Sequence, residues 1–112
     1  MSNRYNLPDD KLKLIHERDR KCVYCGKAMI DPKEGGEKRN WVTIEHMHRF
    51  EPWSDPKWVA YCCMHCNSSR GKLRLRDWFY GRYCKENQIN ETTVADIVKR
   101  YLKEEISILQ TN

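Results

Sequence analysis

The chain has 112 residues, of which 39% are hydrophobic and 33% are charged, and it carries a formal net charge of +5. This length is close to the most common domain size, so we expect one domain spanning residues 1–112. No stretch approaches the roughly 20 apolar residues that cross a bilayer, and the N-terminus has no apolar signal-peptide core. These features argue against a membrane protein and predict a soluble protein in the reducing cytoplasm.

The first expected element is a short N-terminal helix that begins after Pro8 and runs to about Asp19. Acidic residues in the first turn interact favourably with the helix dipole, and proline suits the start of a helix. A polar loop should follow over residues 31–40, which include a proline and two adjacent glycines.

Two strands and a helix are expected in the centre of the chain. In chain order, we expect a strand, an irregular segment, a second strand and a short helix, over residues 41–44, 48–57, 58–61 and 63–71. The strands are rich in β-branched and aromatic residues, and the irregular segment contains two prolines. The first strand should end by presenting Glu45 and His46.

The C-terminal third is expected to be mainly scaffold. Thr93 and Asp96 have the spacing of a helix capping box. Apolar residues then repeat at helical spacing: Val94, Ile97, Val98, Tyr101 and Leu102. The exposed charges of this helix are mixed in sign, so we assign it no functional role. Ile106, Ile108 and Leu109 leave open a dimer interface as an alternative to a frayed tail.

The positive charge is concentrated in one segment. From Asn67 to Lys85 there are six basic residues and one acid, which accounts for the whole excess of five. Four aromatic residues are interleaved with them, as in surfaces that contact phosphates and stack on bases. An amphipathic helix with solvated arginines explains the pattern about as well when it is taken alone. We expect DNA-backbone contacts from Arg70, Lys72, Arg74 and Arg76.

Six cysteines include two Cys-x-x-Cys pairs, Cys22/Cys25 and Cys63/Cys66, separated by 37 residues. In a reducing compartment such pairs more often hold a metal than form disulfides, and four thiolates suit a tetrahedral structural zinc ion. Neighbouring ligand candidates exist at Cys62 and His65, but Cys63 reproduces the two-residue gap of the first pair. The remaining cysteine, Cys84, is expected to be a free thiol.

Three residues between and beside the cysteine pairs suggest phosphodiester chemistry. Glu45 and the carboxamide of Asn67 offer oxygen ligands for a catalytic divalent cation, Mg²⁺ or Mn²⁺. His46 is suited to activate water because its ordinary pKa lies near neutrality. Adjacent side chains on a regular strand point to opposite faces, so Glu45 and His46 can act together only if the strand ends there and the backbone turns.

At these residues the chain resembles the HNH endonuclease family. The resemblance covers residues 18–78 and includes an acid-His pair ending a strand, a loop, a second strand, and a helix that begins Cys-x-x-Cys-Asn. It implies an α+β fold: a small zinc-stabilised domain with a ββα-metal motif, flanked by an N-terminal helix and a C-terminal helical extension over residues 79–112.

The resemblance also implies roles for single residues. His46 is expected to be the general base, Glu45 and Asn67 the ligands of the catalytic ion, and the four paired cysteines the ligands of structural zinc. The chain departs from the family where Glu45 replaces the commoner aspartate and where Lys57 replaces an asparagine before the second strand. Lys57 is expected to contact phosphate. His48 could be a second ligand or a phosphate donor, but we expect an exposed loop histidine.

These observations predict a metal-dependent DNA endonuclease. The alternative is a non-catalytic zinc-knuckle module that binds DNA or RNA, in which the Glu-His pair has no chemical role.

Overall fold

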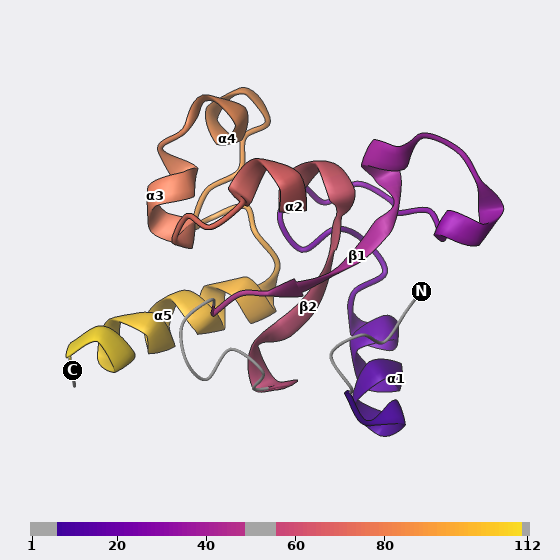
Figure 1. Ribbon diagram of the computed structural model, residues 1–112. Helices are drawn as coiled ribbons and strands as arrows, with labels where there is room; N and C mark the ends of the chain where they lie inside the picture. The colour runs from indigo at the N-terminus through magenta and orange to yellow at the C-terminus, as the bar shows by residue number, and fades with distance from the viewer. Residues whose placement is uncertain (1–6, 49–55, 111–112) are drawn as a thin grey trace.

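The computed structural model describes residues 7–48 and 56–110, with side chains described as far as residue 106 (Figure 1). Within these residues the protein is a small α+β domain of two antiparallel strands and five α-helices. The elements are α1 (Asp9–Arg18), η1 (Pro32–Glu34), η2 (Lys38–Asn40), β1 (Val42–His46), η3 (Pro56–Trp58), β2 (Val59–Cys63), α2 (Met64–Arg70), α3 (Leu75–Phe79), α4 (Arg82–Glu86) and α5 (Asp96–Gln110).

The N-terminal helix has the bounds that its sequence predicts. Pro8 stands at the N-cap, two aspartates follow in the first turn, and the helix ends at Arg18. Asp19 then turns inward, where its Oδ2 accepts a hydrogen bond of 2.9 Å from the backbone N–H of Tyr61 on β2. The helix packs Ile15 against Val59 and Tyr61 of the same strand. This contact fixes the direction in which the chain enters the first cysteine pair.

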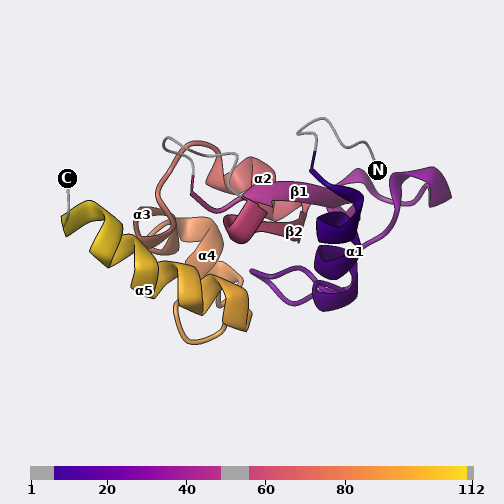
Figure 2. The same ribbon diagram turned by 90° about the horizontal axis from the view of Figure 1, so that it is seen from below.

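The β1–β2 hairpin lies between α1 and α5, which stand on opposite sides of it in both ribbon views (Figures 1 and 2). Side chains alternate along each strand. On β2, Val59 and Tyr61 belong to the small cluster beside α1, whereas Ala60 and Cys62 belong to the larger core beside α2, α3 and α5. Both faces of β2 are therefore buried, whereas β1 is only partly buried from Val42 to Ile44.

Strand β2 leads directly into α2. The Cys63 side chain stands at the N-cap and its Sγ accepts from the backbone N–H of Cys66 at 3.4 Å. The helix ends at Gly71, whose φ of 52° lies in the left-handed region that glycine tolerates. Both ends agree with the sequence prediction, and the first turn of α2 carries the second half of the cysteine cluster.

The basic segment begins in α2 and continues through two short helices, α3 and α4. Leu75, Trp78 and Cys84 are buried in the larger core, while Lys72, Arg82 and Lys85 are exposed. Packed apolar residues with solvated bases between them match the amphipathic interpretation of this segment.

The C-terminal helix begins at Asp96, three residues later than the expected capping position at Thr93. Thr93 instead lies in a turn, where its hydroxyl donates to the carbonyl of Gln88 at 2.8 Å and accepts from the N–H of Asn90 at 2.9 Å. Threonine side chains bond local backbone in turns as readily as at caps, which explains the difference. The expected apolar stripe packs on the core, with Val98 and Tyr101 fully buried.

In the described part of the chain, no helix has the length and apolar content that crossing a bilayer requires. Most of the segment expected to be irregular, and the side chains of Ile108 and Leu109 in the suggested dimer surface, lie outside the described residues.

Candidate metal centre and adjoining polar seam

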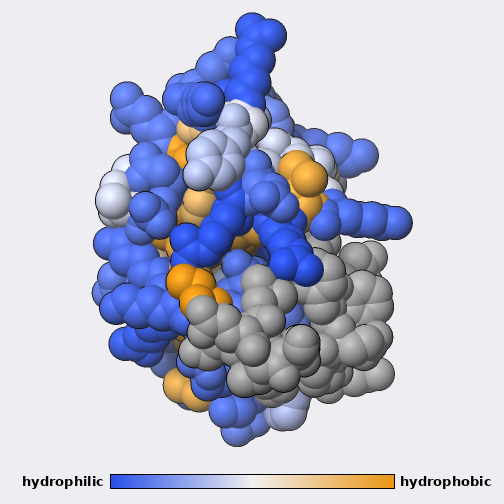
Figure 3. Space-filling model, turned by 90° about the vertical axis from the view of Figure 1, so that its left-hand side faces the viewer, coloured by the Kyte–Doolittle hydropathy of each residue, from blue (hydrophilic) through white to orange (hydrophobic). Residues whose placement is uncertain are grey.

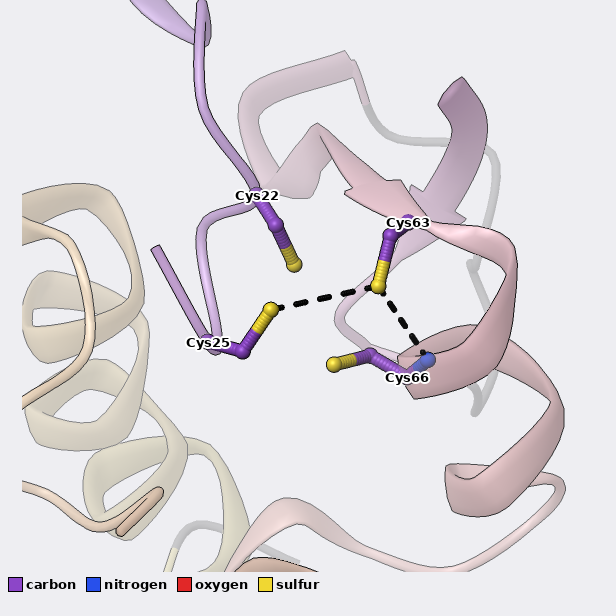
Figure 4. A group of neighbouring side chains, drawn as sticks. All are labelled: Cys22, Cys25, Cys63 and Cys66. Carbon is purple, nitrogen blue, oxygen red and sulfur yellow. Dashed lines mark hydrogen bonds between the residues drawn. The ribbon is translucent and has the colours of Figure 1, made fainter. Parts of the chain in front are cut away.

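Four cysteine side chains converge at the start of α2 (Figure 4). The Sγ atoms of Cys22, Cys25, Cys63 and Cys66 all lie within 4.8 Å of one another, and the Cys25–Cys63 distance is 3.9 Å. A tetrahedral ion with Zn–S bonds of about 2.3 Å places its sulfurs about 3.8 Å apart. The cluster therefore has the ligand type and spacing of a site that could hold a structural metal ion such as zinc.

The four thiols of this cluster differ in pKa. Hydrogen bonding to Cys25 lowers the pKa of Cys22 to about 7, and hydrogen bonding to Cys22 lowers the pKa of Cys63. The same contacts raise the pKa values of Cys25 and Cys66. Coordination of a cation would require the thiolate form of these cysteines.

The neighbouring ligand candidates lie outside the cluster. The Cys62 thiol is 3.5 Å from the hydroxyl of Thr43, and burial raises its pKa well above the ordinary value. The His65 ring packs against Tyr83, with ring centroids 4.7 Å apart. Cys84 is buried on α4, and burial raises its pKa to about 12. The two-residue gap thus identified the grouped cysteines correctly.

The expected acidic ligand, Glu45, lies in the interior. Its side chain is 0% exposed, and Oε2 accepts a hydrogen bond of 2.7 Å from the Tyr24 hydroxyl. The same oxygen is 3.1 Å from Nη1 of Arg70, whose side chain is 1% exposed. Burial and the charge of Glu45 raise the pKa of Tyr24, so the phenol stays protonated and acts as the donor.

Arg70 also binds the backbone on both sides of this ion pair. Nη1 donates to the carbonyl of His46 at 3.2 Å, Nη2 to Met47 at 2.7 Å, and Nε to Leu73 at 2.9 Å. The rigid fork of donors suits this task, and the bonds offset the cost of burying a cation. The expectation that Arg70 contacts DNA is therefore corrected, because its guanidinium is directed inward and fully engaged.

Asn67 and Arg70 are three residues apart on α2 and face β1 together. The Asn67 Nδ2 atom donates to Thr43 Oγ1 at 3.0 Å and to the carbonyl of Ile44 at 3.4 Å. Thr43 and Glu45 are two residues apart on β1 and share its face. We call these four residues, Thr43, Glu45, Asn67 and Arg70, the polar seam. It begins one residue after the metal ligand candidate Cys66.

His46 does not join the polar seam. The strand continues regularly through both residues, with Glu45 opposite Ala60 and His46 opposite Val59. Alternation along a regular strand directs the two side chains to opposite faces. The strand ends at His46, and the bend in the chain comes at Met47, after both residues.

A second buried polar chain was not expected from the sequence. His48 is buried rather than exposed, and its Nδ1 lies 2.9 Å from the Tyr101 hydroxyl. Tyr101 donates its own proton to Glu105 Oε2 at 2.8 Å, so His48 must be the donor to Tyr101 through a protonated Nδ1. The spacing of Tyr101 and Glu105 by four residues on α5 was the available sequence signal. This chain links the end of β1 to α5.

The other basic candidates are at least partly exposed. Lys72 is exposed and Arg74 is half-buried. Arg76 is 39% exposed and donates to the carbonyl of Leu102 at 3.0 Å. Lys57 lies 4.9 Å from the ring centre of Trp58 and 3.8 Å from a carboxylate oxygen of Glu104. The face that carries α3 and α5 is predominantly hydrophilic (Figure 3).

Comparison with known proteins finds no matching family model, no matching curated protein and no matching solved structure.

Proposed function

We propose that the protein is a metal-dependent DNA endonuclease built on an HNH-type ββα-metal motif, with structural zinc at the four cysteines. The observation that carries the proposal is the polar seam. It puts a carboxylate and a carboxamide, Glu45 and Asn67, on one interface between β1 and α2, directly beside the cysteine cluster. The order of two strands followed by a helix that begins Cys-x-x-Cys-Asn adds support.

Each group in this site has a distinct chemical role. Glu45 and Asn67 would supply oxygen ligands to Mg²⁺ or Mn²⁺. The cation supplies Lewis-acid stabilisation of the phosphate and of the departing 3′-oxygen. His46 would accept the proton of the attacking water. Lys72, Arg74, Arg76 and Lys57 would contact the DNA backbone.

A second candidate is a zinc-knuckle module that binds nucleic acid without cutting it. The buried ion pair between Glu45 and Arg70 favours this function, because an arginine already neutralises the carboxylate that a cation would need. The orientation of His46, on the opposite face of β1 from Glu45, favours it as well. Both candidates share the metal site and the basic surface.

Nicking of supercoiled plasmid, with and without Mg²⁺ or Mn²⁺, distinguishes the two functions. For the nuclease we expect metal-dependent nicking that His46→Ala lowers by about two to four orders of magnitude. His16→Ala is the matched control, because His16 lies exposed on α1. Fluorescence anisotropy with labelled DNA should give unchanged affinity for both variants. Binding by the wild-type protein without nicking under any metal would establish the non-catalytic module.

A metal titration separates the roles within the site. Asn67→Ala and Glu45→Gln should need more Mn²⁺ for half-maximal nicking. The first variant loses the carboxamide oxygen, and the second loses the negative charge of the carboxylate. Glu45→Gln is preferred to Glu45→Ala, because glutamine can still accept from Tyr24 and Arg70. His46→Ala should stay inactive at every Mn²⁺ concentration. Rescue of His46→Ala by Mn²⁺ would contradict its role as the base.

A further inference from the structure

Helix α4 reaches the cysteine cluster through one side chain. The hydroxyl of Tyr83 lies 3.2 Å from the Sγ atom of Cys66. Its ring is held on two sides, stacked on Trp78 with ring centroids 6.0 Å apart and edge-on to His65 at 4.7 Å. The position of the hydroxyl is therefore set by ring packing and not by the sulfur contact alone.

The chemistry of the cluster decides which atom is the donor. A cysteine that coordinates a metal is a thiolate and has no proton to give, so only the tyrosine hydroxyl can donate. A tyrosine hydroxyl, with its ordinary pKa of about 10, is protonated near neutral pH and can therefore donate. Four thiolates around a divalent ion carry excess negative charge, and donors directed at sulfur stabilise it. The N–H of Cys66 does the same for Cys63 at 3.4 Å.

We propose that Tyr83 is a functional part of the four-cysteine metal site, in which its hydroxyl donates a hydrogen bond to the metal-bound Cys66 thiolate and tightens metal binding. This role depends on metal at the cysteines and is independent of nuclease activity. It also makes the position of α4 depend on the metal site, because this hydrogen bond attaches α4 to the ligand Cys66. Metal loss should then loosen the surface that carries Arg82 and Lys85.

Tyr83→Phe tests the proposal because it removes the hydroxyl and keeps both ring contacts. Partners of metal ligands typically contribute about 10–100-fold to affinity. We therefore expect zinc transfer from Tyr83→Phe to a chromogenic chelator to show an affinity at least about tenfold weaker than in the wild type. In cobalt-substituted protein, the sulfur-to-cobalt charge-transfer band should shift, because loss of a donor changes the energy of the thiolate electrons. Tyr80→Phe is the control, because Tyr80 is 77% exposed.

Equal zinc affinity and an unshifted cobalt band in Tyr83→Phe would overturn the proposal. A measurement on the wild-type protein guards against a folding defect in the variant. With spin-active cadmium at the cysteines, the bond predicts a Tyr83 hydroxyl proton that exchanges slowly and couples to the metal nucleus. A rapidly exchanging hydroxyl without coupling would also overturn the proposal, whatever the variant does.

Discussion

Arg70 and Glu45 form an ion pair in the interior of the protein, with Nη1 of Arg70 3.1 Å from Oε2 of Glu45 and neither side chain more than 1% exposed. Burying two charges is costly, and a pair of this kind is maintained only when further hydrogen bonds satisfy both partners. Here the Tyr24 hydroxyl and three backbone carbonyls supply them. The pair therefore joins α2 to the end of β1.

Loss of the Arg70 guanidinium should destabilise the fold strongly. Arg70→Met leaves the Glu45 carboxylate buried without its cation, and breaking a buried pair on one side costs about 3–5 kcal/mol. Arg82→Met is the control, because Arg82 is 91% exposed and its substitution should change stability by less than about 0.5 kcal/mol. Urea denaturation in excess zinc measures both. Equal midpoints for Arg70→Met and the wild type would contradict the structural role of the pair.

Removal of the metal should unfold the domain. The cysteine cluster joins the first pair to the start of α2, and a domain of this size has little core with which to replace such a link. We expect elemental analysis to give one zinc per chain and circular dichroism to show loss of helix on chelation. Cys63→Ser should fail to retain zinc, whereas Cys84→Ser should retain it. A folded Cys63→Ser protein with its full zinc content would disprove the assignment.

Charge reversal on the basic segment should weaken DNA binding in a salt-dependent way. Each lost phosphate contact reduces the slope of log affinity against log salt by about 0.9. Lys72→Glu with Arg74→Glu should therefore flatten the slope by up to about 1.8, while Lys13→Glu on α1 should leave it unchanged. Anisotropy titrations over a range of salt concentrations measure the slope. An unchanged slope in the double variant would mean that another surface contacts the DNA.

The chain from His48 through Tyr101 to Glu105 should contribute to stability in a pH-dependent way. Tyr101→Phe removes a donor and an acceptor from buried partners, which typically costs about 1–3 kcal/mol. Burial raises the pKa of Tyr101 above its ordinary value of 10.0. The contribution of Tyr101 to the free energy of unfolding is therefore fully present below about pH 10. It decreases above that pH, where the phenol of the unfolded chain ionises.

Unfolding of Tyr101→Phe and wild type at several pH values tests this linkage. The difference in their free energies of unfolding should be constant near neutral pH and should become smaller as the pH rises above about 10. Tyr80→Phe, in which the hydroxyl lies at the surface, should match the wild type throughout. A difference that widens with alkaline pH would reverse the sign of the linkage.

Features that depend on neighbours along the chain could be predicted from the sequence. The first helix follows from Pro8 and its acidic first turn, α2 follows from its start at Cys63 and its end at Gly71, and the cysteine grouping follows from matching two-residue gaps. In each case the responsible interactions span only a few residues, so spacing and residue type are sufficient to predict them.

The partners of the buried polar residues, in contrast, depend on contacts between distant parts of the chain. Arg70 is 25 residues from Glu45 in sequence, and His48 is 53 residues from Tyr101. Neither pairing leaves a local pattern, since it depends on how α2 and α5 pack against the hairpin. From sequence, an arginine in a basic segment is predicted to lie at the surface, and a histidine after a strand is predicted to lie in a loop. Arg70 and His48 are both buried in the structure, because hydrogen bonds to their partners offset the free-energy cost of removing them from water.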